Sequence, residues 1–161
     1  VGDSTMSILK VDTLQPATGS VVHAVGHVLQ VVQGTSSTYT ALSAGGSNSI
    51  YVDTGLTATI TPKFASSKIL ILHSSSVLGN ATHDAIIRLL RGSTNIHQLN
   101  FWSDNTSYHY MTGAFQYLDS PSTTSATTYK TQVYKNQNDF LYGYNNEVQS
   151  ISTLTLMEIA Q

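Results

Sequence analysis

The sequence predicts an all-β protein, an antiparallel β-sandwich with a jelly-roll arrangement of strands. No window of a dozen residues has the 3.6-residue apolar period of a helix, whereas two-residue alternation recurs along the chain. Turn-forming residues separate the alternating segments at intervals of about 8 to 15 residues, and no longer repeat indicates a propeller or solenoid. About nine or ten short strands without helical crossovers favour two packed antiparallel sheets.

The N-terminal part of the chain predicts an arm that precedes one domain. Residues 1–20 are polar and end in a turn-forming cluster at residues 15–19, so the sandwich domain is expected over residues 21–161. A chain of this length buries about two-thirds of its unfolded surface in one core, so one domain is sufficient. The first long strand is expected at residues 27–33, ahead of a loop at 34–49 that is rich in Ser, Thr and Gly.

The middle of the chain predicts four further strands. Residues 49–53 and 56–62 read as two strands joined by a tight turn at 53–55, because apolar residues alternate with threonines in the second segment. Residues 67–78 predict a long strand. The segment 84–91 has some helical character, but the turn that follows it and the return of Ile after that turn favour one strand of a hairpin.

The C-terminal half continues the same pattern. Alternation predicts a strand at residues 109–118, followed by a loop of Ser, Thr and Pro. Three more strands are then expected, at residues 127–134, 139–144 and 152–159.

Two of these strands carry apolar residues on both faces. This is unusual in a β-sandwich, in which one face of each sheet packs in the core and the other contacts solvent. Ile69 to Leu72 form an uninterrupted apolar run, and the C-terminal strand carries apolar residues on both parities. Either an extra layer or a neighbouring subunit must cover the second face, and we expect an oligomer. The residues expected at the subunit interface are Ile69, Ile71, Leu154, Leu156, Met157 and Ile159.

Charge and composition exclude several classes of protein. The seven Lys and Arg residues are scattered, so no basic stripe is available to bind a nucleic acid. The longest aliphatic run is far shorter than the roughly 18 residues that cross a bilayer, so we expect no membrane insertion. The absence of cysteine excludes a disulfide framework and a thiolate site.

The sequence does not predict an enzyme, a cofactor or a resident metal. It lacks a Gly-x-Ser-x-Gly nucleophile elbow, and its acidic residues are dispersed and mostly occupy turns. His23 and His27 are four residues apart, but on a strand this spacing separates them by about 13 Å, too far for one ion. A single histidine repeated around a symmetry axis remains an alternative metal site.

Clustered aromatic residues give the strongest indication of ligand binding. Trp102 and Tyr108 flank a group of Asp, Asn, Ser and Thr, and Tyr142 and Tyr144 lie on one strand face next to amides. A flat ring beside amide and hydroxyl groups suits the apolar face and the hydroxyls of a sugar. These four residues are therefore candidate glycan contacts. The alternative is that their side chains pack in the core of the domain or in the interface between subunits.

Four stretches of the chain together resemble small structural proteins of tailed bacteriophages, especially marine and cyanobacterial ones, of the tail-fibre or fibre-tip type. The stretches are residues 7–16, residues 52–62 running into 66–71, residues 88–96, and residues 117–121 through to 127–130. The resemblance implies a homotrimer of compact β-sandwich heads, like the jelly rolls of the tumour-necrosis-factor and complement-C1q type. It also implies display on a virion, at a place that touches the host surface.

Together these inferences predict a non-enzymatic virion structural protein on a tail fibre or another external appendage. Its expected partners are two further copies of itself, other virion proteins through the arm at residues 1–20, and host-surface polysaccharide. Two alternatives stay open: a purely architectural module that decorates a capsid or joins fibre segments without a ligand, and a secreted carbohydrate-binding module.

Overall fold

The computed structural model describes residues 24–42, 50–79, 83–103, 109–135, 140–145 and 148–161. These residues form twelve strands, every strand pair is antiparallel, and none of them is helical. The described part of the chain accordingly has no helix with the length and hydropathy that a membrane crossing requires.

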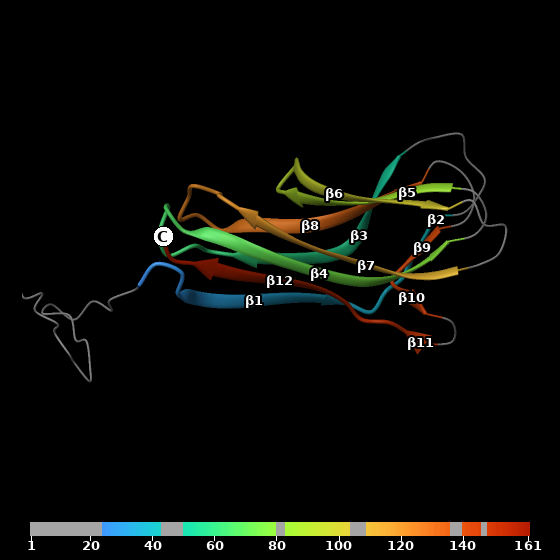
Figure 1. Ribbon diagram of the computed structural model, residues 1–161, viewed down its shortest axis with the longest axis horizontal. Helices are drawn as coiled ribbons and strands as arrows, with labels where there is room; N and C mark the ends of the chain where they lie inside the picture. Colours follow the sequence, from blue (N-terminus) through green and yellow to red (C-terminus); the bar gives the residue numbers. More distant parts are fainter. Residues whose placement is uncertain (1–23, 43–49, 80–82, 104–108, 136–139, 146–147) are drawn as a thin grey trace, which may run out of the picture.

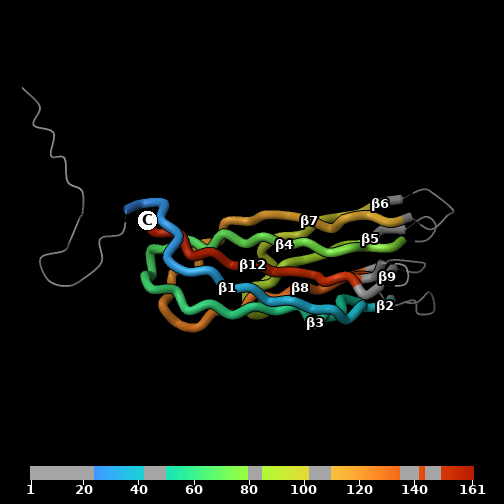
Figure 2. Tube along the Cα trace, turned by 90° about the horizontal axis from the view of Figure 1, so that it is seen from below, coloured from blue at the N-terminus to red at the C-terminus, as the bar shows by residue number. Residues whose placement is uncertain are grey.

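Two antiparallel sheets lie face to face (Figure 1), one of six strands and one of four. The four long strands of sheet A have the order β1 (Val28–Ser36), β12 (Ser152–Ile159), β4 (Lys68–Gly79) and β7 (His109–Asp119), and two short strands complete this sheet. Sheet B has the order β3 (Tyr51–Ile60), β8 (Thr127–Lys135), β5 (His83–Arg91) and β6 (Thr94–Ser103). Figure 2 shows β7, β4, β12 and β1 side by side, with the strands of sheet B running along the same axis.

Short strands complete one end of the sandwich. β9 (Phe140–Tyr142) pairs with the last residues of β4 and with β2 (Thr40–Leu42), and β10 (Tyr144–Asn145) pairs with β11 (Val148–Gln149). The C-terminus and the start of β1 lie at the opposite end (Figure 1). Because the eight long strands pass from one sheet to the other at each step except within the β5–β6 hairpin, the predicted antiparallel jelly-roll sandwich is confirmed.

The core lies between the two inner faces and follows the two-residue period of each strand. On β12, residues alternate between buried and half-buried from Ser152 to Ile159. Ile69 and Ile71 of β4, and Leu154 and Leu156 of β12, are 0% exposed within a single chain. The prediction that these four side chains form a subunit interface was therefore wrong, because the opposite sheet of the same chain already covers them.

Several element boundaries differ from the sequence prediction. A single strand, β3 (Tyr51–Ile60), stands where two strands were predicted at 49–53 and 56–62, and it bulges between Asp53 and Thr57 where a turn was expected. β1 extends to Ser36, and β2 lies inside the predicted loop. The 84–91 segment is a strand and turns at Gly92 into β6, so the predicted hairpin is confirmed. The predicted arm at residues 1–20 lies outside the described residues.

A buried carboxylate fixes the chain between β3 and β4. Glu158 of β12 is 0% exposed and accepts hydrogen bonds from the backbone N–H of Lys63 at 2.7 Å and of Phe64 at 3.3 Å. Gln30 Nε2 donates to its second oxygen at 2.6 Å. Burial alone would raise the pKa of Glu158, but these hydrogen bonds hold it below its usual value. The carboxylate therefore stabilises the loop as a charged acceptor.

Candidate functional site

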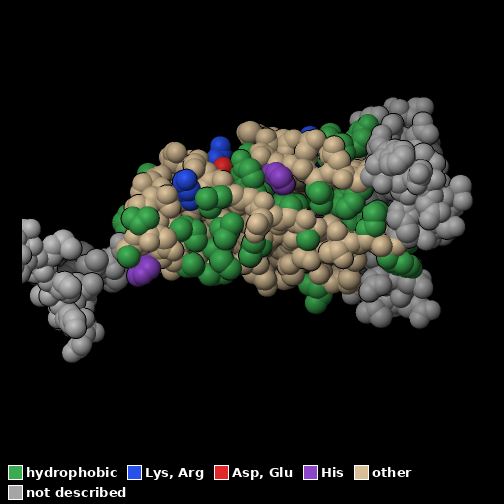
Figure 3. Space-filling view, in the orientation of Figure 1, with side chains coloured by type: hydrophobic (Ala, Val, Ile, Leu, Met, Phe, Trp, Pro, Cys, Tyr) green, Lys and Arg blue, Asp and Glu red, His purple; other side chains and the backbone are tan. Residues whose placement is uncertain are grey.

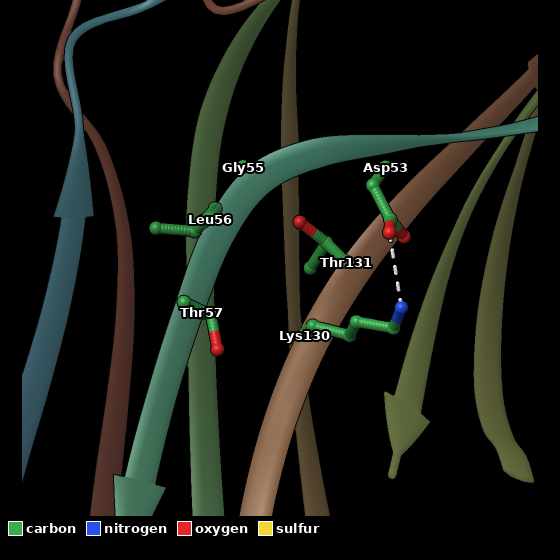
Figure 4. Close-up of a pocket in the computed structure, with 6 residues that line it drawn as sticks. All are labelled: Asp53, Gly55, Leu56, Thr57, Lys130 and Thr131. Carbon is green, nitrogen blue, oxygen red and sulfur yellow. Dashed lines mark hydrogen bonds and ion pairs between the residues drawn. The ribbon is translucent and has the colours of Figure 1, made fainter. Parts of the chain in front are cut away.

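The bulge in β3 opens a small pocket between β3 and β8. Asp53 pairs with Gln132 and Thr57 pairs with Lys130, so the three residues between Asp53 and Thr57 lie opposite Thr131 alone. Gly55 adopts a φ of 77°, a conformation that favours glycine. The pocket has a volume of about 220 Å³ and is lined by Asp53, Gly55, Leu56, Thr57, Lys130 and Thr131 (Figure 4).

A threonine pair closes the bottom of this gap in the sheet. The Oγ1 atoms of Thr54 and Thr131 lie 2.6 Å apart, and Thr54 Oγ1 also lies 3.1 Å from the carbonyl oxygen of Thr131. The backbone N–H of Leu56 donates to Thr54 Oγ1 at 3.1 Å. These contacts satisfy polar groups that the bulge removes from the β-ladder, so the widened strand pair is held in one geometry.

Beside the pocket, a row of polar side chains crosses the outer face of sheet B. Lys130 Nζ donates to Asp53 Oδ2 at 3.0 Å, and the two side chains converge from neighbouring strands (Figure 4). Gln132 Nε2 donates to Asp53 Oδ1 at 2.6 Å. The hydrogen bond from Gln132 and the nearby Lys130 and Arg88 hold the pKa of Asp53 below its ordinary value, so this carboxylate is ionised at neutral pH.

Arg88 occupies the centre of the same row. Its Nε donates to Gln132 Oε1 at 2.8 Å, and its Nη2 contacts the same oxygen. The guanidinium carbon lies 3.4 Å from the ring centre of Tyr51, a cation–π contact. Tyr51 in turn lies beside Tyr134, with ring centroids 5.0 Å apart. Among the described residues, no carboxylate forms an ion pair with Arg88.

The outer face of sheet A has a different character. Register places one apolar residue from each strand in a single row: Val31, Met157, Leu70 and Leu118. Val31 is 55% exposed and Leu118 is 49% exposed, whereas Met157 and Leu70 are half-buried. Val28, Ile159 and Leu72 flank this row on the same face. We call these seven residues the apolar patch.

The described part of the outer face of sheet A is almost without charge. Lys68 is the one charged side chain that β1, β12, β4 and β7 place on it; the polar neighbours of the apolar patch are Ser, Thr and Gln. Charged side chains are also sparse on the face of the molecule seen in Figure 3. Met157 and Ile159, unlike the other four predicted interface residues, belong to this outer face and are half-buried.

The predicted glycan contacts have separate positions. Tyr142 is 0% exposed, and its hydroxyl pairs with His73 Nε2 at 2.9 Å, so it is a core residue and the prediction of a ligand contact was wrong. Trp102 and Tyr144 lie on β6 and β10 in the structure, near the end of the sandwich opposite the C-terminus. Tyr108 lies outside the described residues.

The described residues contain no group of three or more His, Asp or Glu side chains with the geometry of a metal site. His73 is 3% exposed and stacks on Phe115, with ring centroids 4.6 Å apart. Burial lowers the pKa of His73 to about 4. His73 is therefore a neutral core residue at neutral pH.

Comparison with known proteins shows a distant likeness to viral proteins. No protein family matches the chain, and no curated protein is significantly similar to it in sequence. A chain in the structure of infectious bursal disease virus, Gx strain, aligns over 93% of this chain with 14% identity and a TM-score of 0.45. A chain of the Gt strain aligns over 95% with 11% identity and a TM-score of 0.42. This chain covers 42% and 43% of those two chains, so it spans less than half of their length.

The polar row on sheet B was not predicted from the sequence. Register adds Gln98 of β6, opposite Arg88, to the row. The row thus draws on β3, β5, β6 and β8, and no motif joins residues 53, 88, 98 and 132. The one local signal is the Asp53-Thr54-Gly55 segment, for which the sequence predicts a turn between two strands. Gly55 does mark an irregular backbone, but as a bulge within one strand.

Proposed function

We propose that this chain is a virion structural module that assembles into a homotrimer through the apolar patch and serves on an external appendage such as a tail fibre. The observation that carries the proposal is the apolar patch itself. An antiparallel sheet in contact with water alternates apolar inward and polar outward residues, whereas sheet A exposes an apolar row on its outward side. Large exposed apolar patches mark surfaces that bind another protein.

The near absence of charge around the apolar patch favours a second copy of the same chain as the partner. Interfaces between different proteins commonly use complementary charges for orientation and specificity. A face of Ser, Thr and Gln offers both donors and acceptors, so it can lie against an identical face without like-charge repulsion. The sequence resemblance to trimeric fibre heads favours three copies around one axis.

The virion role is supported by the sequence resemblance to phage tail-fibre structural proteins. In this arrangement the segment at residues 1–20 joins the head to other virion proteins. The strand ends that carry Trp102 and Tyr144 lie at the end of the sandwich away from the C-terminus, a position suited to contact with host-surface polysaccharide. Weak binding at each head would be multiplied by the number of heads on a particle.

Light scattering of the purified chain in solution tests the assembly. We expect a mass of three copies for the wild type and a single copy for Leu118→Asp and for Val31→Lys, which place a charge on the apolar patch. Thr59→Asp, on the exposed outer face of sheet B, is the control and should remain trimeric. Circular dichroism checks that each variant keeps its strands. A wild type that is monomeric at micromolar concentration contradicts the proposal.

Binding to host cells or to a glycan array tests the attachment role separately. We expect the trimer to bind and Trp102→Ala to bind less. A trimer that binds no cell-surface glycan would instead indicate a purely architectural module within the virion.

A further inference from the structure

We propose that the outer face of sheet B binds an acidic sugar of a surface polysaccharide, with Arg88 holding the sugar carboxylate and Tyr51 supporting the ring. This inference rests on the proposed attachment function and gives it a location different from the aromatic residues at the strand ends. Two adjacent rows of side chains form the site. The first is Asp53, Gln132, Arg88 and Gln98, and the second is Tyr51, Tyr134, Ile86 and Asn100.

The direct partners of Arg88 are neutral groups. Arg88 is half-buried, and within the described part of the chain it is held by an amide oxygen and an aromatic ring rather than by a carboxylate. A half-buried cation with only neutral direct partners retains a strong attraction for an anion. Two of its five N–H bonds are used on Gln132, and guanidinium groups bind carboxylates through paired N–H bonds.

The charges within the two rows favour an anionic ligand. Lys130 and Asp53 form an ion pair and compensate each other, so Arg88 is the charge without a direct counterion in these rows. Register places Asp84 on the same face of β5, opposite Trp102 and beyond the second row. The whole chain has a formal net charge of −2. Arg88 is therefore the cation that attracts an anionic group to these two rows.

The aromatic and amide groups around Arg88 suit a sugar more than a simple anion. Tyr51 and Tyr134 form a half-exposed pair of rings in the next row, and tyrosine combines an apolar surface with a hydroxyl. Gln98 and Asn100 continue both rows on β6, and Gln98 Nε2 lies 3.3 Å from Asn100 Oδ1. These amides offer donors and acceptors for sugar hydroxyls at fixed positions on the sheet.

The pocket extends the site on the side of Asp53. Its volume of about 220 Å³ is below the roughly 300–1,000 Å³ of sites for drug-sized ligands, so it has room for one small substituent of a sugar. The Asp53 carboxylate at its rim is fixed by Lys130 and Gln132 and can accept from a sugar hydroxyl. The site thus presents a cation, an aromatic support and a fixed carboxylate on a rigid sheet.

Titration of the purified trimer with polygalacturonate in 0.15 M salt tests this inference, with neutral dextran as the second ligand. We expect wild type to bind polygalacturonate and not dextran. Arg88→Gln should weaken binding at least about tenfold, as expected for the loss of a charge-assisted hydrogen bond. Tyr51→Ala should also weaken it, and Tyr51→Phe should keep it because the ring remains.

Lys63→Gln is the matched control, because it removes one positive charge from an exposed loop residue whose Nζ donates to the carbonyl oxygen of Leu29 in sheet A and not to the polar row. Equal losses in Arg88→Gln and Lys63→Gln would show non-specific attraction of a polyanion and overturn the site. A wild-type trimer that binds no polygalacturonate would also overturn it, while leaving the proposed structural role intact. A monomeric wild type would contradict the proposed role instead.

Discussion

Arg91 Nη1 lies 2.9 Å from both carboxylate oxygens of Asp119, so a single ion pair joins the end of β5 in sheet B to the end of β7 in sheet A. The Tyr129 hydroxyl of β8 donates to Asp119 Oδ2 at 2.7 Å. Asp119 is 5% exposed, and burial together with the bond to Asp119 raises the pKa of the Tyr129 hydroxyl. The Asp119 carboxylate is thus largely shielded from water. Its bonds to Arg91 and Tyr129 therefore link the two sheets.

Asp119→Asn should lower the free energy of unfolding by about 2 kcal/mol, because hydrogen bonds to a charged group contribute roughly 1.5–3 kcal/mol and Arg91 is partly solvated. Urea unfolding measures the change. Asp53→Asn is the matched control, since its ion pair with Lys130 is exposed and should cost less than about 1 kcal/mol. Equal losses in the two variants would contradict the role of Asp119 as a buried fastener.

Adjacent residues on β12 should respond differently to truncation. Leu156 is 0% exposed, so Leu156→Ala should cost about 2–5 kcal/mol of folding stability at any protein concentration. Met157 lies on the apolar patch, so Met157→Ala should change the folding of one chain by less than about 1 kcal/mol and raise the concentration at which trimers dissociate. Urea unfolding and size-exclusion chromatography over a dilution series separate these effects. A concentration-independent loss for Met157→Ala would place that side chain in the core of the single chain.

His73 should make the protein less stable as the pH falls below 6.5. Burial lowers its pKa from 6.5 to about 4, so the unfolded chain binds a proton between these values and the folded chain does not. Stability is therefore complete above about pH 6.5, falls as the pH drops through this window, and levels off below about pH 4. From pH 7 to pH 4.5 the expected loss is roughly 2 kcal/mol.

His73→Gln separates this effect from the titration of carboxylates, because the glutamine amide can still reach the Tyr142 hydroxyl but does not ionise. The difference in unfolding free energy between wild type and variant should therefore shrink as the pH is lowered from 7 to 4.5. A difference that stays constant over this range would show that His73 has the same pKa in the folded and the unfolded chain, against the lowering by burial.

Gly34 should not tolerate alanine. A Cβ atom at this position of β1 would lie 2.0 Å from the carbonyl oxygen of Thr57 on β3, where the edges of the two sheets approach each other. Because the clash involves backbone, the strands must separate, and Gly34→Ala should cost at least about 1–3 kcal/mol. Thr35→Ala, at the adjacent exposed position, is the control and should stay within about 0.5 kcal/mol. Thermal unfolding of the two variants is the measurement.

Much of the fold was predictable because it depends on local pattern. The two-residue alternation of the C-terminal strand and the turn at Gly92 locate β12 and the β5–β6 hairpin, since pleating places alternate side chains on opposite faces. The same pattern failed at residues 53–55, where Gly55 indicates an irregular backbone but not whether the chain reverses or bulges. That choice depends on the pairing of β3 with β8, which lies about 75 residues further along the chain.

The sequence by itself determined the all-β class, most strand positions and the apolar character of both faces of β4 and β12. Only the tertiary structure decided that Ile69, Ile71, Leu154 and Leu156 face the opposite sheet of the same chain, while Met157 and Leu70 face outward. A local pattern shows that one face of a strand is apolar and is therefore covered from water. It does not show whether a second sheet of the same chain or a second subunit covers that face, because either one removes it from water. The polar row around Arg88 likewise exists only because hydrogen-bond register brings four strands, distant in sequence, into one sheet.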